Sequence, residues 1–136
     1  MVKPLRFGRA EKLKSKKRIE HLFASGSSLA AFPLRVKYRF APAAEGAAPV
    51  QMGVSVSKKH FKRAVDRNRI KRLIREAYRL QKATLIQAVK DKHLNGALFF
   101  IYTDKNKTTF TAVYSAMTKC LAALQQKAAA NHENAG

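Results

Sequence analysis

Residues 58–79 restrict the fold of this chain of 136 residues more than any other segment. The segment reads KKHFKRAVDRNRIKRLIREAYR, in which Ile70, Leu73, Ile74 and Ala77 follow the i, i+3, i+4, i+7 spacing of one buried helical stripe. Ten basic residues against two acidic ones leave it a charge of +8 (10 − 2). The pattern predicts an amphipathic helix that packs its apolar stripe on a core and carries a cationic ridge elsewhere.

The cationic ridge is too crowded to serve only as a solvated helix face. Like charges four residues apart in a helix repel each other by a few tenths of a kcal/mol, and only Glu76 offsets them here. Phosphate is the simplest neutraliser, because the planar guanidinium of arginine can bind two of its oxygens. At 100° per residue the ridge consists of Asn68, Arg72, Arg75 and Arg79, with Arg67 and Lys71 beside it.

The charge of the whole chain agrees with a polyanionic partner. There are 28 Lys and Arg against 8 Asp and Glu, a net charge of +20 that resists compaction unless a counter-charge is bound. Nucleic acid is the leading partner class, and an anionic membrane surface is the weaker alternative. No apolar run reaches the roughly 18–20 residues of a membrane span, and Cys120 is the only cysteine. We therefore expect a soluble cytoplasmic protein without disulfides and without an intrinsic metal site.

The first half of the chain predicts one helix and two strands. The helix begins at Lys12 and stops at 25–28, where Gly26 is free to adopt the left-handed conformation. Leu34–Phe40 alternates apolar and basic residues, and Gln51–Ser57 alternates apolar residues with small hydroxyls. We expect these two strands to pair in antiparallel fashion and to expose a face of Arg, Lys and Ser.

The second half predicts two helices around one strand. A long helix runs from Ala64 toward Val89, with a break as one possibility, and Asn95-Gly96 marks a turn. The apolar run Ala97–Tyr102 then suggests an interior strand covered on both faces. The last helix spans about Thr109–Ala129.

Together these elements predict an α+β fold, a two-layer α/β sandwich in the order α-β-β-α-β-α. A small mixed sheet has helices packed against it, since each helix carries one apolar stripe. The length suits one RNA-binding domain over residues 1–136, with 1–10 and 131–136 as flexible tails.

Two runs carry a resemblance to a known family. Gly53–Lys59 and then Ala64–Glu76, with the core Arg67-Asn68-Arg69, resemble the signature of the protein subunit of bacterial ribonuclease P. Leu13–Ser28 and Leu34–Phe40 are similar to that family's first helix and first strand. The likeness implies the family's fold, shared with one domain of a ribosomal protein, and an unusual left-handed β-α-β crossover.

The resemblance also implies a function. Ribonuclease P is a ribonucleoprotein endonuclease that removes the 5′ leader from precursor tRNA. Its RNA subunit holds the active site and its Mg²⁺ ions, so the protein is an accessory subunit of the enzyme without catalytic residues of its own. The implied partners are the catalytic RNA, in a 1:1 complex with a protein monomer, and the precursor tRNA leader; a membrane is not among them.

Site residues follow by position from the same resemblance. The signature helix would bind RNA through Arg63, Arg67, Asn68, Arg69, Lys71, Arg72, Arg75 and Arg79. The leader cleft would be formed by Ile19, Phe23, Arg35, Lys37, Ser55, Lys58 and Lys59. Ile19 stands where the family commonly has an aromatic, and Arg35 and Lys37 stand at positions often apolar or aromatic. Leader binding here is therefore expected to depend more on charge than on stacking.

Some assignments stay open at this point. Phe23 is equally suited to a core and to a cleft, and Phe32 and Phe61 suit either role. The other aromatics of the strands are expected to pack in the core: Tyr38, Phe40, Phe99 and Phe100. The alternative function is a ribosomal or ribosome-assembly RNA-binding protein with no enzyme role. Only the Arg67–Arg75 signature and the pair Lys58-Lys59 argue against it.

Overall fold

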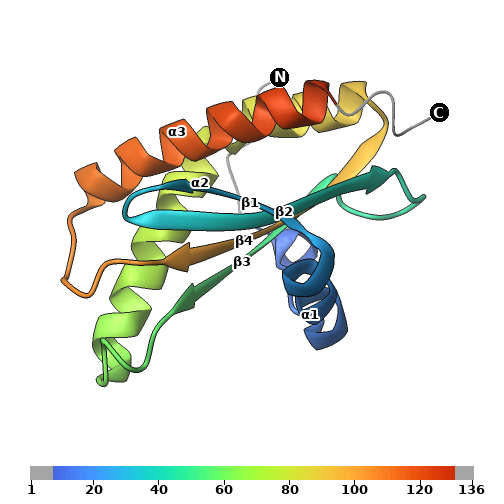
Figure 1. Ribbon diagram of the computed structural model, residues 1–136. Helices are drawn as coiled ribbons and strands as arrows, with labels where there is room; N and C mark the ends of the chain where they lie inside the picture. The colour runs from blue at the N-terminus through green and yellow to red at the C-terminus, as the bar shows by residue number, and fades with distance from the viewer. Residues whose placement is uncertain (1–7, 131–136) are drawn as a thin grey trace.

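The structure is a computed structural model that describes residues 8–130. A short 3₁₀ turn, three helices and four strands follow one another along the chain (Figure 1). Their bounds are η1 (Arg9–Glu11), α1 (Lys16–Ser25), β1 (Ser27–Ala31), β2 (Leu34–Pro42), β3 (Val50–Val56), α2 (Ala64–Asp91), β4 (Leu94–Tyr102) and α3 (Phe110–Ala129). The predicted order of helices and strands is confirmed, with β1 as an additional strand.

The four strands form one mixed sheet in the order β1-β2-β4-β3. β2 pairs in antiparallel fashion with both β1 and β4, whereas β3 pairs with β4 in parallel. The prediction that Leu34–Phe40 and Gln51–Ser57 pair with each other is therefore wrong, because β4 lies between them. β4 is the most apolar strand, and the central position covers its backbone and side chains better than an edge does.

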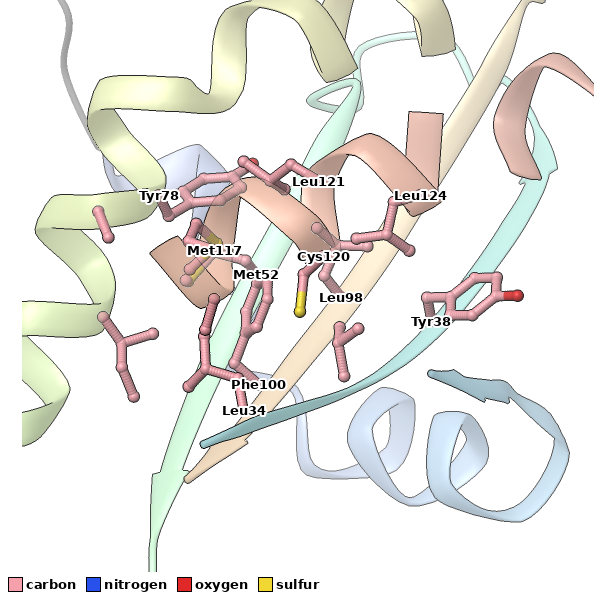
Figure 2. Packing of buried hydrophobic residues seen from close by; sticks show 14 of the residues in the cluster. Leu34, Tyr38, Met52, Tyr78, Leu98, Phe100, Met117, Cys120, Leu121 and Leu124 are labelled. Carbon is pink, nitrogen blue, oxygen red and sulfur yellow. The ribbon is translucent and has the colours of Figure 1, made fainter. Parts of the chain in front are cut away.

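Helices cover the two faces of this sheet unequally. α2 and α3 pack side by side on one face, and α1 lies on the opposite face, where it covers only part of the strands (Figure 1). The core lies between the sheet and the helix pair, where Leu98 and Phe100 of β4 meet Tyr78 of α2 and Met117 of α3 (Figure 2). The predicted α+β class is confirmed.

The chain crosses from β3 to its parallel neighbour β4 through α2. This helix is continuous over its 28 residues, so it has no break. β3, α2 and β4 thus form the β-α-β unit for which the left-handed crossover is predicted, and its hand stays a prediction.

The segment before α1 differs from expectation. Residues 8–10, predicted to lack fixed structure, include the start of η1, whereas residues 1–7 and 131–136 of the predicted tails lie outside the described residues. The first helix begins at Lys16 rather than Lys12, because the Ser15 hydroxyl accepts a hydrogen bond from the Arg18 backbone N–H at 3.3 Å and caps it there. The Leu13 N–H instead donates to the Met52 carbonyl at 2.9 Å.

Two glycines have roles other than those predicted. Gly26 follows α1 with an extended backbone (φ −78°), so the left-handed prediction is wrong. A Cβ at this position would lie 2.4 Å from the Leu22 carbonyl oxygen of α1 and 3.1 Å from the Tyr38 carbonyl oxygen of β2, so the narrow space between the helix end and the sheet explains the glycine. Gly96 and Asn95 lie inside β4 rather than in a turn, and His93, with φ 55°, makes the reversal instead.

Candidate nucleic-acid interface

The cationic ridge on the N-terminal half of α2 is present as predicted. Asn68, Arg72, Arg75 and Arg79 line one shallow hollow of about 340 Å³ together with Glu76. Asn68, Arg72 and Arg75 are exposed, while the buried stripe of the helix faces the sheet. Within residues 8–130, no carboxylate pairs with Arg72 or Arg75. These two guanidinium groups are therefore available to an external anion.

Arg79 is neutralised within the protein. Its Nε donates to both carboxylate oxygens of Glu76 at 3.2 Å, and the two side chains form an ion pair. The hydrogen bond from Arg79 lowers the pKa of Glu76, and the same bond raises the pKa of Arg79. The free cationic part of the ridge is consequently shorter than the sequence suggests.

The two arginines that flank Asn68 in the sequence bind the chain's own backbone. Arg67 donates from Nη1 to the Phe61 and Lys62 carbonyl oxygens at 2.8 and 2.9 Å. Arg69 donates from Nη1 to the Thr108 carbonyl at 3.2 Å. Both were expected to contact RNA, and their geometry gives them a structural role as well.

The face of the sheet opposite α2 and α3, here called the open face, carries three of the predicted cleft residues, Arg35, Lys37 and Ser55. Strand register sets Phe99 of β4 between Lys37 of β2 and Gly53 of β3. In the next row, Ile101 lies between Arg35 and Ser55. Because cross-strand partners share a face of the sheet, basic groups border one side of an apolar centre and a small hydroxyl borders the other.

A groove of about 580 Å³ joins the open face to the cationic ridge. Ile19 of α1 and Arg75 of α2 both line it, and Gly53 and Phe99 contribute from the sheet. Its full lining is Lys12, Leu13, Lys14, Ile19, Met52, Gly53, Val54, Arg75 and Phe99. Arg75 belongs to the ridge and to the groove, so the two predicted surfaces are continuous.

Phe99 is a groove residue that the sequence analysis assigned to the core. Its ring meets the Phe23 ring edge-on, with centroids 5.3 Å apart, and Phe23 is 41% exposed. Phe23 therefore belongs to the open face rather than to the helix-covered core. The signal for Phe99 was Gly53, because a glycine inside a strand often marks a close approach. A Cβ at Gly53 would lie 2.7 Å from the Phe99 ring.

Residues 9–14 form a strap along β3 that borders the groove. Glu11 anchors it, accepting from the Gly8 N–H at 2.9 Å and pairing with Nζ of Lys82 at 2.6 Å. Lys82 is buried on α2, so this ion pair supplies its counter-charge. Gln51 links the strap to α1, since it donates to the Ala10 carbonyl at 3.0 Å and accepts from the Arg18 guanidinium.

Two predicted cleft lysines and one predicted helix residue lie elsewhere. Lys59 and Arg63 line a separate hollow at the N-terminal end of α2, and Lys58 is exposed in the turn after β3. The structure therefore does not bring Lys58 and Lys59 together with Ile19 and Phe23. Lys71 is half-buried beside the ridge, as its position in the helix predicts.

The described residues contain no group of three His, Cys, Asp or Glu side chains that could hold a metal ion. Between residues 8 and 130, no helix is both long and apolar enough to cross a membrane. Carboxylates are scarce on the ridge and the groove, so both surfaces favour anionic ligands.

A small basic α+β domain that places an arginine ridge beside an open strand face belongs to the class of proteins that bind RNA. Comparison with known proteins gives the family. The family model described as Ribonuclease P matches residues 7–127. The ribonuclease P protein component of Porphyromonas gingivalis is 39% identical over 123 residues, which cover 89% of each chain. That of Chlorobaculum tepidum is 43% identical over 83 residues, 60% of this chain and 54% of the relative.

Solved structures agree on the fold. The ribonuclease P protein of Staphylococcus aureus superimposes with a TM-score of 0.66 at 24% identity, covering 85% of this chain and 95% of its own. That of Thermotoga maritima gives 0.63 at 22% identity, covering 82% and 94%. The chain belongs to the ribonuclease P protein family, and the predicted resemblance is confirmed.

Proposed function

We propose that this chain binds the catalytic RNA of ribonuclease P through the ridge on α2 and holds the 5′ leader of precursor tRNA in the groove. The family assignment makes it a component of an endoribonuclease. One observation carries the proposal that the two surfaces act side by side: Arg75 lines both the ridge hollow and the groove. RNA bound along α2 would therefore lie directly beside a strand held on the open face.

The groove and the open face beside it together support binding of an extended single strand. Phe23 and Phe99 offer an aromatic edge and face that a base can stack against, which is worth about 1–3 kcal/mol per base. Lys37 and Arg35 border the same face and offer charge to the phosphates. Phe99 adds an aromatic to a site that the sequence predicted to depend mainly on charge.

The chemistry itself belongs to the RNA in this proposal. Mg²⁺ ions held mainly by the RNA subunit would activate the attacking water, and the protein's residues would position the leader and reduce phosphate repulsion. Arg72 and Arg75 are suited to this role, because a guanidinium screens phosphates without needing deprotonation. A single protein per RNA and a cytoplasmic location complete the proposal, and the free buried thiol of Cys120 supports the second of these.

The test is reconstitution of leader removal. Purified protein, the cognate catalytic RNA and a 5′-extended precursor tRNA are combined at limiting Mg²⁺, with each macromolecule omitted in turn. We expect the protein to accelerate leader release, and Arg72→Ala and Arg75→Ala to lose most of that acceleration while keeping the wild-type melting temperature. Lys90→Ala removes the same charge from the other end of α2 and serves as the control. No acceleration by the wild-type protein would contradict the proposal and favour a ribosomal RNA-binding role.

A further inference from the structure

A second basic hollow lies at the N-terminal end of α2, outside the ridge and the groove. Its volume is about 470 Å³, and two segments distant in the sequence, 59–66 and 105–107, form its walls. Register explains their meeting, because Val56 and Tyr102, the last residues of the parallel strands β3 and β4, are cross-strand partners. The lining residues are Lys59, His60, Phe61, Lys62, Arg63, Asp66, Lys105, Asn106 and Lys107. We call this hollow the loop site.

The first turns of α2 hold both walls in place. Arg67 binds the carbonyls of Phe61 and Lys62 in one wall, and Arg69 binds the Thr108 carbonyl beside the other. Asp66 pairs with Lys107, its Oδ1 lying 3.4 Å from Nζ.

The loop between β4 and α3 is also fixed from within. The Tyr102 hydroxyl donates to the Asn106 carbonyl at 2.6 Å, and the Asn106 N–H donates to Asp104 Oδ1 at 3.0 Å. The positions of Lys105 and Lys107 are thus defined by the fold before any ligand arrives.

The charge of the loop site is not balanced internally. Five lysines and arginines line it against one carboxylate, a balance of +4 (5 − 1) over these six groups. All five basic side chains are exposed, so packing does not require them. Among residues 8–130, none of Lys59, Lys62, Arg63 and Lys105 has an ion-pair partner. Gathering like charges in this way raises the energy of the free protein, and a bound polyanion would relieve it.

The lining also indicates which part of a nucleic acid would bind. Phe61 is buried, with its ring 5.9 Å from that of Tyr102, so neither of these two rings is offered to a base, and His60 alone contributes an exposed ring to the lining. Four of the five cations are lysines, which act as point charges on phosphate rather than as readers of base edges.

We propose that the loop site binds the phosphate backbone of RNA, without sequence preference, next to the RNA that lies along α2. The inference rests on the proposed function for the kind of partner and adds a contact surface formed by Lys105 and Lys107. Arg69 acts in it as a positioning residue, which places the loop through Thr108.

The test compares two pairs of lysines with the same spacing. Lys105→Ala with Lys107→Ala removes two charges from the loop site, and Lys90→Ala with Lys92→Ala removes two from the far end of α2. Affinity is measured against salt for two probes separately: the catalytic RNA, and the 5′-extended precursor tRNA. We expect the first pair to weaken binding of one probe about tenfold near 150 mM salt and to lower its salt slope by about 0.7–0.9 per lost phosphate.

The two probes identify which RNA occupies the site, and a loss with either supports the proposal. The proposal is overturned if the two lysine pairs change affinity and salt slope equally for both probes. Leader removal by the wild-type protein would then still support the proposed function, so the two failures can be told apart. Lys62→Ala is a second variant that leaves the Lys107–Asp66 pair intact, and it is expected to lower the same slope by about one phosphate.

The role of Arg69 is tested by a double-mutant cycle. Arg69→Ala is combined with the Lys105 and Lys107 substitutions, and RNA affinity is measured with the melting temperature held as a check on folding. If Arg69 acts through the loop, its effect is largely absent once the two lysines are gone. Additive effects would instead assign Arg69 a direct RNA contact and remove it as a positioning residue.

Discussion

The same strands form both faces of the sheet, but their side chains are buried to very different degrees on the two faces. On the helix-covered face, Leu98 and Phe100 are fully buried beneath α2 and α3 (Figure 2). On the open face, the alternate residues Phe99 and Ile101 are only half-buried, and Phe23 of α1 packs against Phe99. Residues adjacent in β4 therefore belong to two environments, one that determines stability and one that is available to a ligand.

The comparison teaches where a small domain can place function. Strand alternation sends every second side chain to each face, so a central strand can contribute fully to the core and still present apolar groups on its other side. On the open face Phe23 is exposed and Phe99 is half-buried, with Lys37 beside it. Exposed aromatic surface of this kind is costly in a protein without a ligand and is typical of an interaction site.

The largest expected effect separates Phe100 from Phe99. Phe100→Ala should lower the free energy of unfolding by about 3–5 kcal/mol, because it leaves a cavity in a fully buried site. Phe99→Ala should cost clearly less, since the side chain is only partly buried and its neighbours can relax. Urea unfolding of both variants measures the difference, and Phe100→Leu provides a milder variant if Phe100→Ala does not fold. An equal cost for Phe99→Ala and Phe100→Ala would break the distinction between the two faces.

The next effect tests how closed the helix-covered face is. Cys120 of α3 is fully buried, and burial raises the pKa of its thiol to about 11 from an ordinary 9.0. At pH 8 the folded chain should then hold roughly 100-fold less thiolate than the unfolded chain. Alkylation by iodoacetamide should slow by at least that factor, and urea should restore it.

The same shift has a defined sign for stability. The raised pKa keeps the Cys120 thiol protonated in the folded state. The contribution of this protonated thiol to the free energy of unfolding is fully present below about pH 9. It is lost as the pH rises from 9 toward 11, because the unfolded chain ionises first. Rapid alkylation of the native protein at pH 8 would show that α3 opens readily and that the helix-covered face is not closed.

The sequence predicted well whatever depends on local periodicity. The stripe from Ile70 to Ala77 located α2, and the same spacing located the ridge around Asn68 on its other side. Alternation in Leu34–Phe40 assigned its residues to the correct faces. In each case one element's own pattern decides the answer, because the side chain's direction follows from the backbone period.

The features that the sequence could not predict depend on contacts between residues that lie far apart in the sequence. The insertion of β4 between β2 and β3 is decided by which strand gains most from central burial, and no local pattern states this. Ser27–Ala31 has weak strand propensity and is a strand only because β2 offers it an edge. Likewise, Arg67 and Arg69 look like their neighbours in sequence, and only the positions of the Phe61 and Thr108 carbonyls distinguish them.

A smaller effect concerns the aromatic part of the open face. Phe99→Ala should weaken binding of the 5′-extended precursor tRNA by about 1–3 kcal/mol, the value of one stacked base, while leaving binding of mature tRNA unchanged. Competition binding with the reconstituted enzyme measures both. Ile101→Ala removes apolar surface from the same strand and face without removing a ring, so it is the matched control. An equal loss for mature tRNA would show that Phe99 does not contact the leader.

The smallest expected effect concerns the charges that border the open face. Arg35 and Lys37 lie beside Ile101 and Phe99, so each is placed to meet one leader phosphate. Replacing both with Gln should lower the slope of log affinity against log salt by about 1.4, from roughly 0.7 per phosphate on a single strand. Lys119→Gln with Lys127→Gln removes the same charge from exposed positions of α3, which covers the other face. If both pairs change the slope equally, only the total charge matters; if the first pair alone does, the leader follows the open face.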